Sequence, residues 1–153
     1  MKTESKRIAD QLHRAYAGKA WHGPSLRELL AGVTAKQAAA RPLAGGHNIW
    51  EIVLHITAWK KTVRRRLMGE AIELSPRQDW PPAGKTAATW RKTLKALEKA
   101  RRELEKTVAS LPDSRLKQIV PGRKHTVYFM LHGLVQHDLY HAGQIALLKK
   151  AKR

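Results

Sequence analysis

Apolar residues along this chain recur with helical spacing in four long stretches that are separated by polar breaks. The stretches cover about residues 4–17, 48–67, 86–111 and 126–150. In each of them the apolar positions are three or four residues apart, which places them on one face of an α-helix. None shows the strict alternation that is typical of a half-buried β-strand. The pattern therefore predicts an all-α fold with four long helices.

Polar residues at the edges of these stretches predict where helices begin. The spacing of a capping box occurs at residues 25–28 and again at 34–37, which predicts two short helices between the first and second long ones. Asn48 is followed three positions later by Glu51, so this pair predicts the start of the second long helix. The short helices are expected to connect the long ones rather than to form a layer of their own.

The connection between the second and third long helices looks irregular. Residues 69–84 contain three prolines and two glycines around Trp80, and we expect this segment to lie over the body of the protein. Helices that each bury one apolar stripe pack together as a bundle. A length of 153 residues also corresponds to about one domain. The sequence thus predicts a single domain over residues 1–153, a four-helix bundle with short connecting helices.

Two histidines in the fourth stretch suggest a metal site. His137 and His141 continue an apolar stripe that includes Met130, Leu134 and Ile145. A step of four residues places both imidazoles on one helix face, one turn apart, and here that face is the buried one. Unpaired imidazoles in a core are costly, and a shared divalent cation would remove the cost by using their neutral nitrogens. The alternative is a pair of hydrogen-bonded core histidines.

A third ligand is needed, because three protein ligands and a water molecule are the usual arrangement of a catalytic zinc site. His55, at the edge of the apolar ridge of the second long helix, is the best candidate. The chain has no cysteine, so nitrogen and oxygen atoms must supply every ligand. Glu51, Asp138 and Gln144 are candidates for supporting the imidazoles. Glu51 also has its capping role, and Asp138 and Gln144 can equally be solvated residues or contacts between helices.

A few other residues are candidates for the surroundings of the site. Trp80, in its proline-rich loop, could roof the histidines, and Arg123, just before the fourth long helix, could meet a substrate carboxylate. The remaining histidines are interpreted as structural or exposed: His13, His22, His47, His125 and His132.

The formal net charge of +18 raises the question of a polyanionic partner. Most of the excess comes from residues 60–66, 91–106 and 149–153. Such a charge attracts nucleic acids through counterion release. However, few aromatic residues lie among the bases, no groove-reading motif is present, and bases spread over helix faces are usually a solvated surface. Nucleic-acid binding is therefore an alternative function and not the favoured one.

The sequence gives no sign of a membrane protein. The amino-terminal residues lack the apolar core of a signal peptide, and no stretch approaches the roughly 18 apolar residues of a membrane span. We therefore expect a cytoplasmic protein without a membrane partner.

Three segments resemble the DinB-like superfamily. They are residues 46–59 (GHNIWEIVLHITAW), 79–82 (DWPP) and 136–145 (QHDLYHAGQI), and the resemblance extends over about residues 8–150. It implies a four-helix bundle, often dimeric, that binds a divalent metal such as zinc or nickel through three histidines. At the matching positions this chain has His55, His137 and His141. The resemblance thus implies the same three ligands as the spacing argument, and it implies a homodimer.

The resemblance says less about the reaction. Some relatives are implied to be thiol-dependent transferases or isomerases that use bacillithiol, mycothiol or glutathione, and many others have no established activity. The expected function is divalent-metal binding, with transfer of a low-molecular-weight thiol to an electrophilic small molecule as the leading activity. Metal-dependent hydrolysis, and a metal-stabilised stress or structural protein without turnover, stay open as alternatives.

Overall fold

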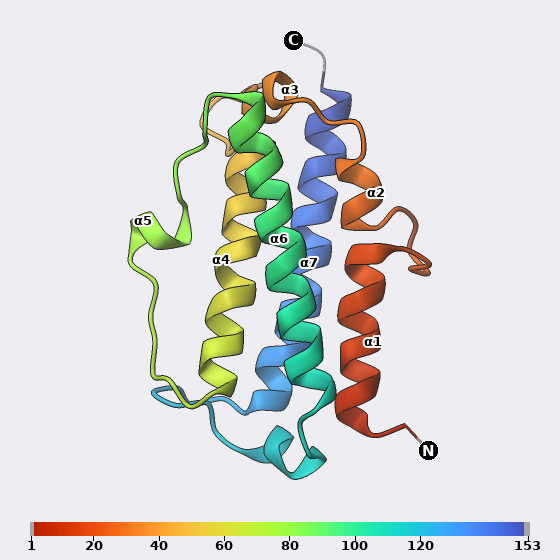
Figure 1. Ribbon diagram of the computed structural model, residues 1–153, viewed down its shortest axis with the longest axis vertical. Helices are drawn as coiled ribbons and strands as arrows, with labels where there is room; N and C mark the ends of the chain where they lie inside the picture. The colour runs from red at the N-terminus through yellow and green to blue at the C-terminus, as the bar shows by residue number, and fades with distance from the viewer. Residues whose placement is uncertain (1, 152–153) are drawn as a thin grey trace.

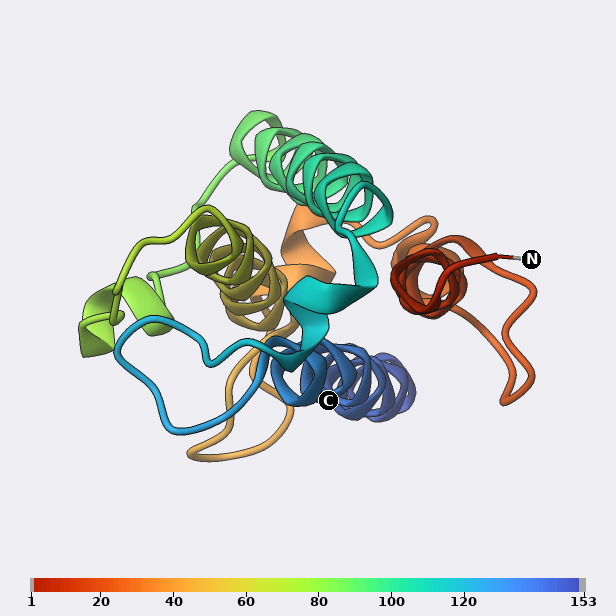
Figure 2. The same cartoon turned by 90° about the horizontal axis from the view of Figure 1, so that it is seen from below.

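Four long helices run side by side in the computed structural model, which describes residues 2–151. They lie along the long axis of the molecule (Figure 1) and form a four-cornered arrangement when seen end-on (Figure 2). The described residues contain no β-strand beyond one isolated bridge between Ile119 and Thr126. The predicted all-α bundle is therefore confirmed. The long helices are α1 (Glu4–Ala17), α4 (Ile49–Leu67), α6 (Ala87–Ala109) and α7 (Val127–Lys150).

Short helices connect the long ones. Helix α2 (Leu26–Leu30) continues the line of α1, and α3 (Ala35–Ala39) crosses one end of the bundle (Figure 1). A 3-10 helix, η1 (Asp113–Lys117), lies at the opposite end. The connection over residues 69–84, expected to be irregular, contains one further helix, α5 (Pro76–Asp79), which lies outside α4 (Figure 2).

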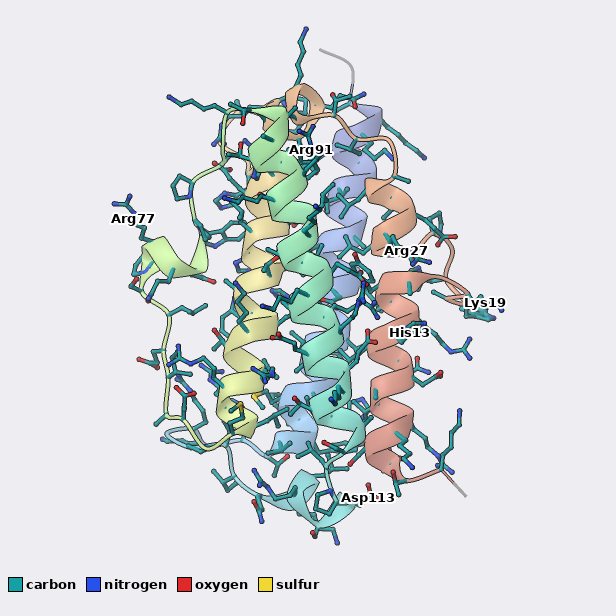
Figure 3. All side chains as sticks on the ribbon, in the orientation of Figure 1. His13, Lys19, Arg27, Arg77, Arg91 and Asp113 are labelled. Atoms are coloured by element: carbon teal, nitrogen blue, oxygen red, sulfur yellow. The ribbon has the colours of Figure 1, made fainter. Side chains whose placement is uncertain are left out.

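Local hydrogen bonds explain where these helices begin. The Asn48 side chain accepts from the backbone N–H of Glu51 at 2.8 Å, and the Glu51 carboxylate accepts from the N–H of Asn48 at 3.1 Å. The two other predicted capping boxes also form. Asp113 of η1 lies below the start of α1 (Figure 3) and accepts from the N–H groups of Glu4 and Ser5, both at 3.0 Å. That contact fastens the distant η1 segment to α1.

The apolar core consists of two clusters with polar side chains between them. One cluster contains Ile56 of α4 and Ile145 of α7, and the other contains Val63 of α4 and Leu134 of α7. Along the helices, Lys60 of α4 and Asp138 and His141 of α7 come between the members of the two clusters, and buried His55 lies next to Ile56. We call this group the polar layer, and it consists of His55, Lys60, Asp138 and His141.

Two bases from the run at residues 60–66 are buried, which corrects the interpretation of this run as solvated surface. Lys60 is 1% exposed and Arg66 is 6% exposed. Position 60 follows Ile56 by four residues, so the helix turns it toward the core whatever its charge. Its ammonium group reaches Asp138 of α7, with 2.5 Å between Nζ and Oδ2. Asp138, for which a solvated position was left open, is thus fully buried.

Helix α7 is apolar on both its buried and its exposed side. Phe129, Tyr140 and Leu147 are all more than half exposed. They are 11 and 7 residues apart, so they share one face of the helix. Even so, no helix within the described residues is both long enough and apolar enough to cross a membrane.

Candidate metal centre

The three candidate ligands meet beside the polar layer, to which His55 and His141 belong. His55 comes from α4, and His137 and His141 come from α7. Each offers one ring nitrogen, and these three nitrogens lie within 4.8 Å of one another. Nε2 of His55 and Nε2 of His137 are 3.0 Å apart. The fold therefore brings together the residues that both the helical spacing and the family resemblance selected.

Hydrogen bonds fix the protonation of two of these rings. Nδ1 of His55 lies 2.8 Å from the backbone oxygen of Asp79, which can only accept, so Nδ1 donates and Nε2 keeps its lone pair. Nδ1 of His141 likewise donates to Oε1 of Gln144 at 2.6 Å. Both Nε2 atoms are thus left as bases, which is the form that a metal ion requires.

The third ring, His137, carries an unsatisfied buried atom. Its Nε2 donates to the lone pair on Nε2 of His55, which leaves Nδ1 unprotonated. This Nδ1 is buried and has no hydrogen-bond partner, and the same is true of Oδ1 of Asp138, 3.9 Å away. A cation bound at Nε2 of His137 would place the proton on Nδ1, where it faces that carboxylate oxygen. Metal binding would therefore satisfy two atoms that are otherwise unpaired.

The donor set suits a borderline divalent ion. Two imidazole nitrogens on one tetrahedral zinc ion are roughly 3.3 Å apart, close to the observed 3.0 Å between His55 and His137. Three neutral imidazoles without a thiolate accept zinc, nickel, copper or iron. The residues present thus fit a divalent metal ion and do not by themselves choose among these ions.

Burial keeps two of the rings neutral. His55 and His141 are 6% and 4% exposed. Burial lowers the pKa of His55, and it lowers the pKa of His141 to about 4 although the hydrogen bond that His141 donates to Gln144 raises it. His137 differs from the expectation of a buried ring, because 23% of its side chain is exposed where it borders a cavity. This opening gives a small molecule access to the site.

The loop between α4 and α6 covers the site with an aromatic stack. The Trp80 ring lies flat on the ring of His55, with 3.9 Å between centroids, as expected for a roof. The other face of Trp80 stacks on His47 at 3.5 Å. The sequence predicts only a structural or exposed position for His47, because nothing in it pairs this residue with a loop more than 30 residues away.

Asp79 is a second residue that the sequence argument did not place in the site. Besides its backbone contact with His55, its carboxylate lies 3.0 Å from Nδ1 of that ring. The same carboxylate accepts from Nε1 of Trp59 at 2.7 Å. The one feature of the sequence that could have placed Asp79 in the site is its position beside Trp80 in the DWPP segment.

Comparison of the sequence with profiles of known protein families shows to which family this chain belongs. A profile described as the DinB superfamily matches residues 20–145. The chain belongs to the DinB superfamily. The matched region runs from just before α2 into α7 and includes His55, His137 and His141. Comparisons with curated proteins and with solved structures found no match.

Of the residues that the sequence suggests as supports for the three histidines in this DinB-superfamily chain, some contact the histidines and others lie farther away. Gln144 contacts His141, and Asp138 faces His137 as described. Glu51 does not contact the three histidines, because its carboxylate is taken up by the capping box, Arg41 and His47. Arg123 lies at the far side of the cavity that His137 borders.

Proposed function

We propose that this protein binds one divalent ion, zinc or nickel, through His55, His137 and His141, and that it transfers a small thiol to an electrophile. The observation that carries the metal-binding part is the convergence of three ring nitrogens, two of them held as bases by hydrogen bonds from Nδ1. The DinB membership supports the same reading. The thiol-transfer part is supported by the resemblance to thiol-dependent relatives and by the cavity beside His137.

The chain's own residues would orient the ligands and shape access. An ion with an open coordination position lowers the pKa of a bound thiol or water molecule, which gives a nucleophile near neutral pH. Asp79 and Gln144 hold the rings of His55 and His141 in place. Trp80 shields one face of His55 from water. His137 borders the opening through which an electrophile would approach.

An assay with defined thiols tests this function. Bacillithiol, mycothiol and glutathione are each offered with 1-chloro-2,4-dinitrobenzene. In the reaction a carbon–sulfur bond forms, chloride leaves with the electron pair of the carbon–chlorine bond, and the thiol proton goes to solvent. We expect metal-dependent turnover with at least one thiol, loss of turnover in His137→Ala, and full retention in His22→Ala, which removes an exposed histidine.

The outcomes separate the proposal from its alternatives. Turnover that is unaffected by chelators and by His137→Ala would contradict the proposal. One bound ion per chain, a melting temperature that falls on chelation, and no turnover with any thiol would favour a metal-stabilised protein without catalysis.

A basic stripe on α6 supports nucleic-acid binding as a second candidate function. Its five bases are exposed and recur at steps of three and four residues, so they line one helix face over about 21 Å. Within the described part of the chain, three of them form no ion pair: Lys92, Lys95 and Lys106. The complete stripe consists of Lys92, Lys95, Lys99, Arg102 and Lys106.

Salt dependence tests this second candidate. Binding of a labelled single-stranded oligonucleotide would weaken steeply with salt and would be lost in the double variant Lys92→Glu/Lys95→Glu. It would persist in His137→Ala, because His137 lies on α7 and not on α6. Equal binding by wild type and the double variant would contradict a role for the stripe.

A further inference from the structure

A cavity of about 580 Å³ opens beside the candidate metal centre. His137 and Asp79 line it next to the three histidines, and Arg66 and Arg123 line it near the end of α4 and the start of α7. Because His137 also belongs to the histidine cluster, the cavity and the metal centre form one continuous site. A molecule bound in the cavity would therefore have one end at the histidines and the other at the two arginines.

The two arginines converge on a single backbone oxygen. Arg66 donates to the carbonyl of Ile72 from Nε at 3.2 Å and from Nη2 at 3.0 Å. Arg123 donates to the same carbonyl from Nη2 at 3.2 Å. Its Nη1 pairs with Glu73, whose side chain is 76% exposed. Two guanidinium groups thus share one neutral acceptor and one carboxylate that lies mostly in solvent.

Arg66 forms no ion pair within residues 2–151. It is 6% exposed, yet no carboxylate among the described residues forms an ion pair with it, and its Nη1 donates no hydrogen bond there. Burial and the positive charge of Arg123 lower the pKa of Arg66, and the negative charge of Glu73 offsets this only in part. A buried charge without a counterion is costly, and a bound anion would offset that cost.

The other carboxylate of the cavity is engaged at the histidine end. Asp79 accepts from Nε1 of Trp59 at 2.7 Å and lies 3.0 Å from Nδ1 of His55. Its charge therefore belongs to the metal centre. The arginine end keeps an excess of positive charge, and the planar guanidinium fork matches the two oxygens of a carboxylate.

An aromatic wall connects the two ends. The guanidinium carbon of Arg66 lies 5.5 Å from the centroid of the Trp59 ring, and the centroid of the His137 ring lies 6.1 Å from it. Leu134 and Phe129 add apolar surface to the lining. Gly133, one turn before His137, leaves open space where a side chain would project. The cavity is thus apolar along its length and cationic at the end far from the histidines.

We propose that this cavity binds the electrophilic substrate and selects a small aryl or alkyl carboxylate, with the carboxylate on Arg66 and Arg123 and the apolar body along Trp59. This inference rests on the proposed function for the role of the bound molecule. The carboxylate preference itself rests only on the cavity and is measurable without turnover. It assigns specificity to Arg66 and Arg123, which lie away from the three histidines.

Calorimetric binding of 3-phenylpropionate and of the neutral 3-phenylpropionamide tests the inference. Both are measured on the intact protein, as purified and after treatment with a chelator. We expect the carboxylate to bind at least tenfold more tightly than the amide, in both forms of the protein. Equal affinity for the two probes, or no binding of the carboxylate, would overturn the inference.

Variants locate the binding. Arg123→Gln is expected to weaken the carboxylate at least tenfold and to leave the amide unchanged, and Arg66→Gln is expected to do the same. Arg123 is more exposed than Arg66, so we expect Arg123→Gln to fold. The test therefore stands even if Arg66→Gln, which changes a buried residue, fails to fold. Unchanged carboxylate binding in a folded Arg123→Gln protein would count against the assignment.

Two glycines of α7 supply a matched pair. Gly133→Leu would fill the cavity and abolish binding of both probes. Gly143→Leu adds the same side chain at a position that also has open space but borders a different cavity, and it should bind as wild type does. Equal effects of the two substitutions would contradict the location.

Metal content, measured by elemental analysis on every variant, separates this inference from the proposed function. Selective carboxylate binding by a protein that takes up no metal would support the cavity assignment and contradict the metal-dependent function. One metal ion per chain with equal binding of both probes would support metal binding and contradict the cavity assignment.

Discussion

At the scale of single residues, the polar layer places a charged pair where apolar side chains would pack more simply. Lys60 and Asp138 are 1% and 0% exposed. Burial alone would raise the pKa of Asp138, but the Lys60 ammonium group and His137 together more than offset this and the pKa is lowered. One oxygen of Asp138 binds Lys60 and the other faces His137, so the pair connects the core to the candidate metal centre.

Removing Lys60 alone should therefore lower the free energy of unfolding. Removing Lys60 and Asp138 together should lower mainly the affinity for metal. Lys60→Met leaves a buried carboxylate without a counterion and is expected to lower the free energy of unfolding by about 3–5 kcal/mol. Lys60→Met/Asp138→Leu should recover most of that loss but bind metal 10- to 100-fold more weakly, because His137 loses the acceptor facing its Nδ1. Chemical denaturation and metal titration measure the two effects. A double variant with wild-type metal affinity would exclude this role for Asp138.

The lowered histidine pKa values predict how acid affects the metal-free protein. The pKa of His141 is about 4 in the folded protein, against 6.5 for a free side chain. The unfolded chain therefore binds the proton more readily between these values, and folding stability is lost as the pH falls from about 6.5 to about 4. Thermal unfolding in chelator should show a shallower fall for His141→Gln than for wild type. Parallel curves would mean that the His141 pKa is not lowered by folding.

At the scale of elements, the connection between α4 and α6 does more than join two helices. Its Trp80 lies between the rings of His47 and His55, and Asp79 holds the other edge of His55. Gly84, later in the same connection, passes so close to Trp50 that an added Cβ would lie 2.6 Å from the indole ring. The close fit at Gly84 and the stack at Trp80 together hold the connection against the bundle.

Trp80→Ala tests the part that this connection plays. Loss of two stacked rings should lower the free energy of unfolding by about 1–3 kcal/mol and speed release of the metal, because one face of His55 becomes open to water. Stopped-flow transfer of the ion to a chelator gives the release rate. Trp21→Ala is the control, since Trp21 is fully exposed and lies outside the site. Equal release rates in the two variants would show that Trp80 does not shield the ion.

The helices could be predicted from sequence because their signals are local. Asn48 and Glu51 lie three residues apart, and the cap they predicted is present. The convergence of His137 with His141 followed in the same way from a step of four residues. The burial of Lys60 did not, because its partner Asp138 is 78 residues away and only packing of α4 on α7 brings them together. The same holds for Arg66 and Arg123, whose shared contact at Ile72 depends on two loops meeting.

At the scale of the whole molecule, we propose that the exposed apolar face of α7 contacts a second copy of the chain. Phe129, Tyr140 and Leu147 are 66%, 66% and 69% exposed and share one helix face. The family resemblance implies a homodimer, and an apolar helix face of this kind is typical of such an interface. The net charge of +18 on each chain opposes association, so salt should favour it.

Sedimentation velocity measures this association. We expect a dimer at micromolar concentration in about 0.15 M salt, with more monomer at low salt. Leu147→Glu should give a monomer, whereas Lys99→Glu, on α6, should leave the dimer intact. A wild-type protein that remains monomeric at all salt concentrations would exclude the α7 interface.

The central claim is that three imidazoles from α4 and α7 hold one divalent ion, and X-ray absorption at the metal edge tests it most directly. Protein purified without added metal, or titrated with zinc or nickel, should bind one ion per chain. The spectrum should show three imidazole nitrogens at about 2.0–2.1 Å for zinc, and His55→Ala, His137→Ala and His141→Ala should each remove that signal. Uptake below about a tenth of an equivalent, or an ion surrounded only by oxygen, would contradict the account.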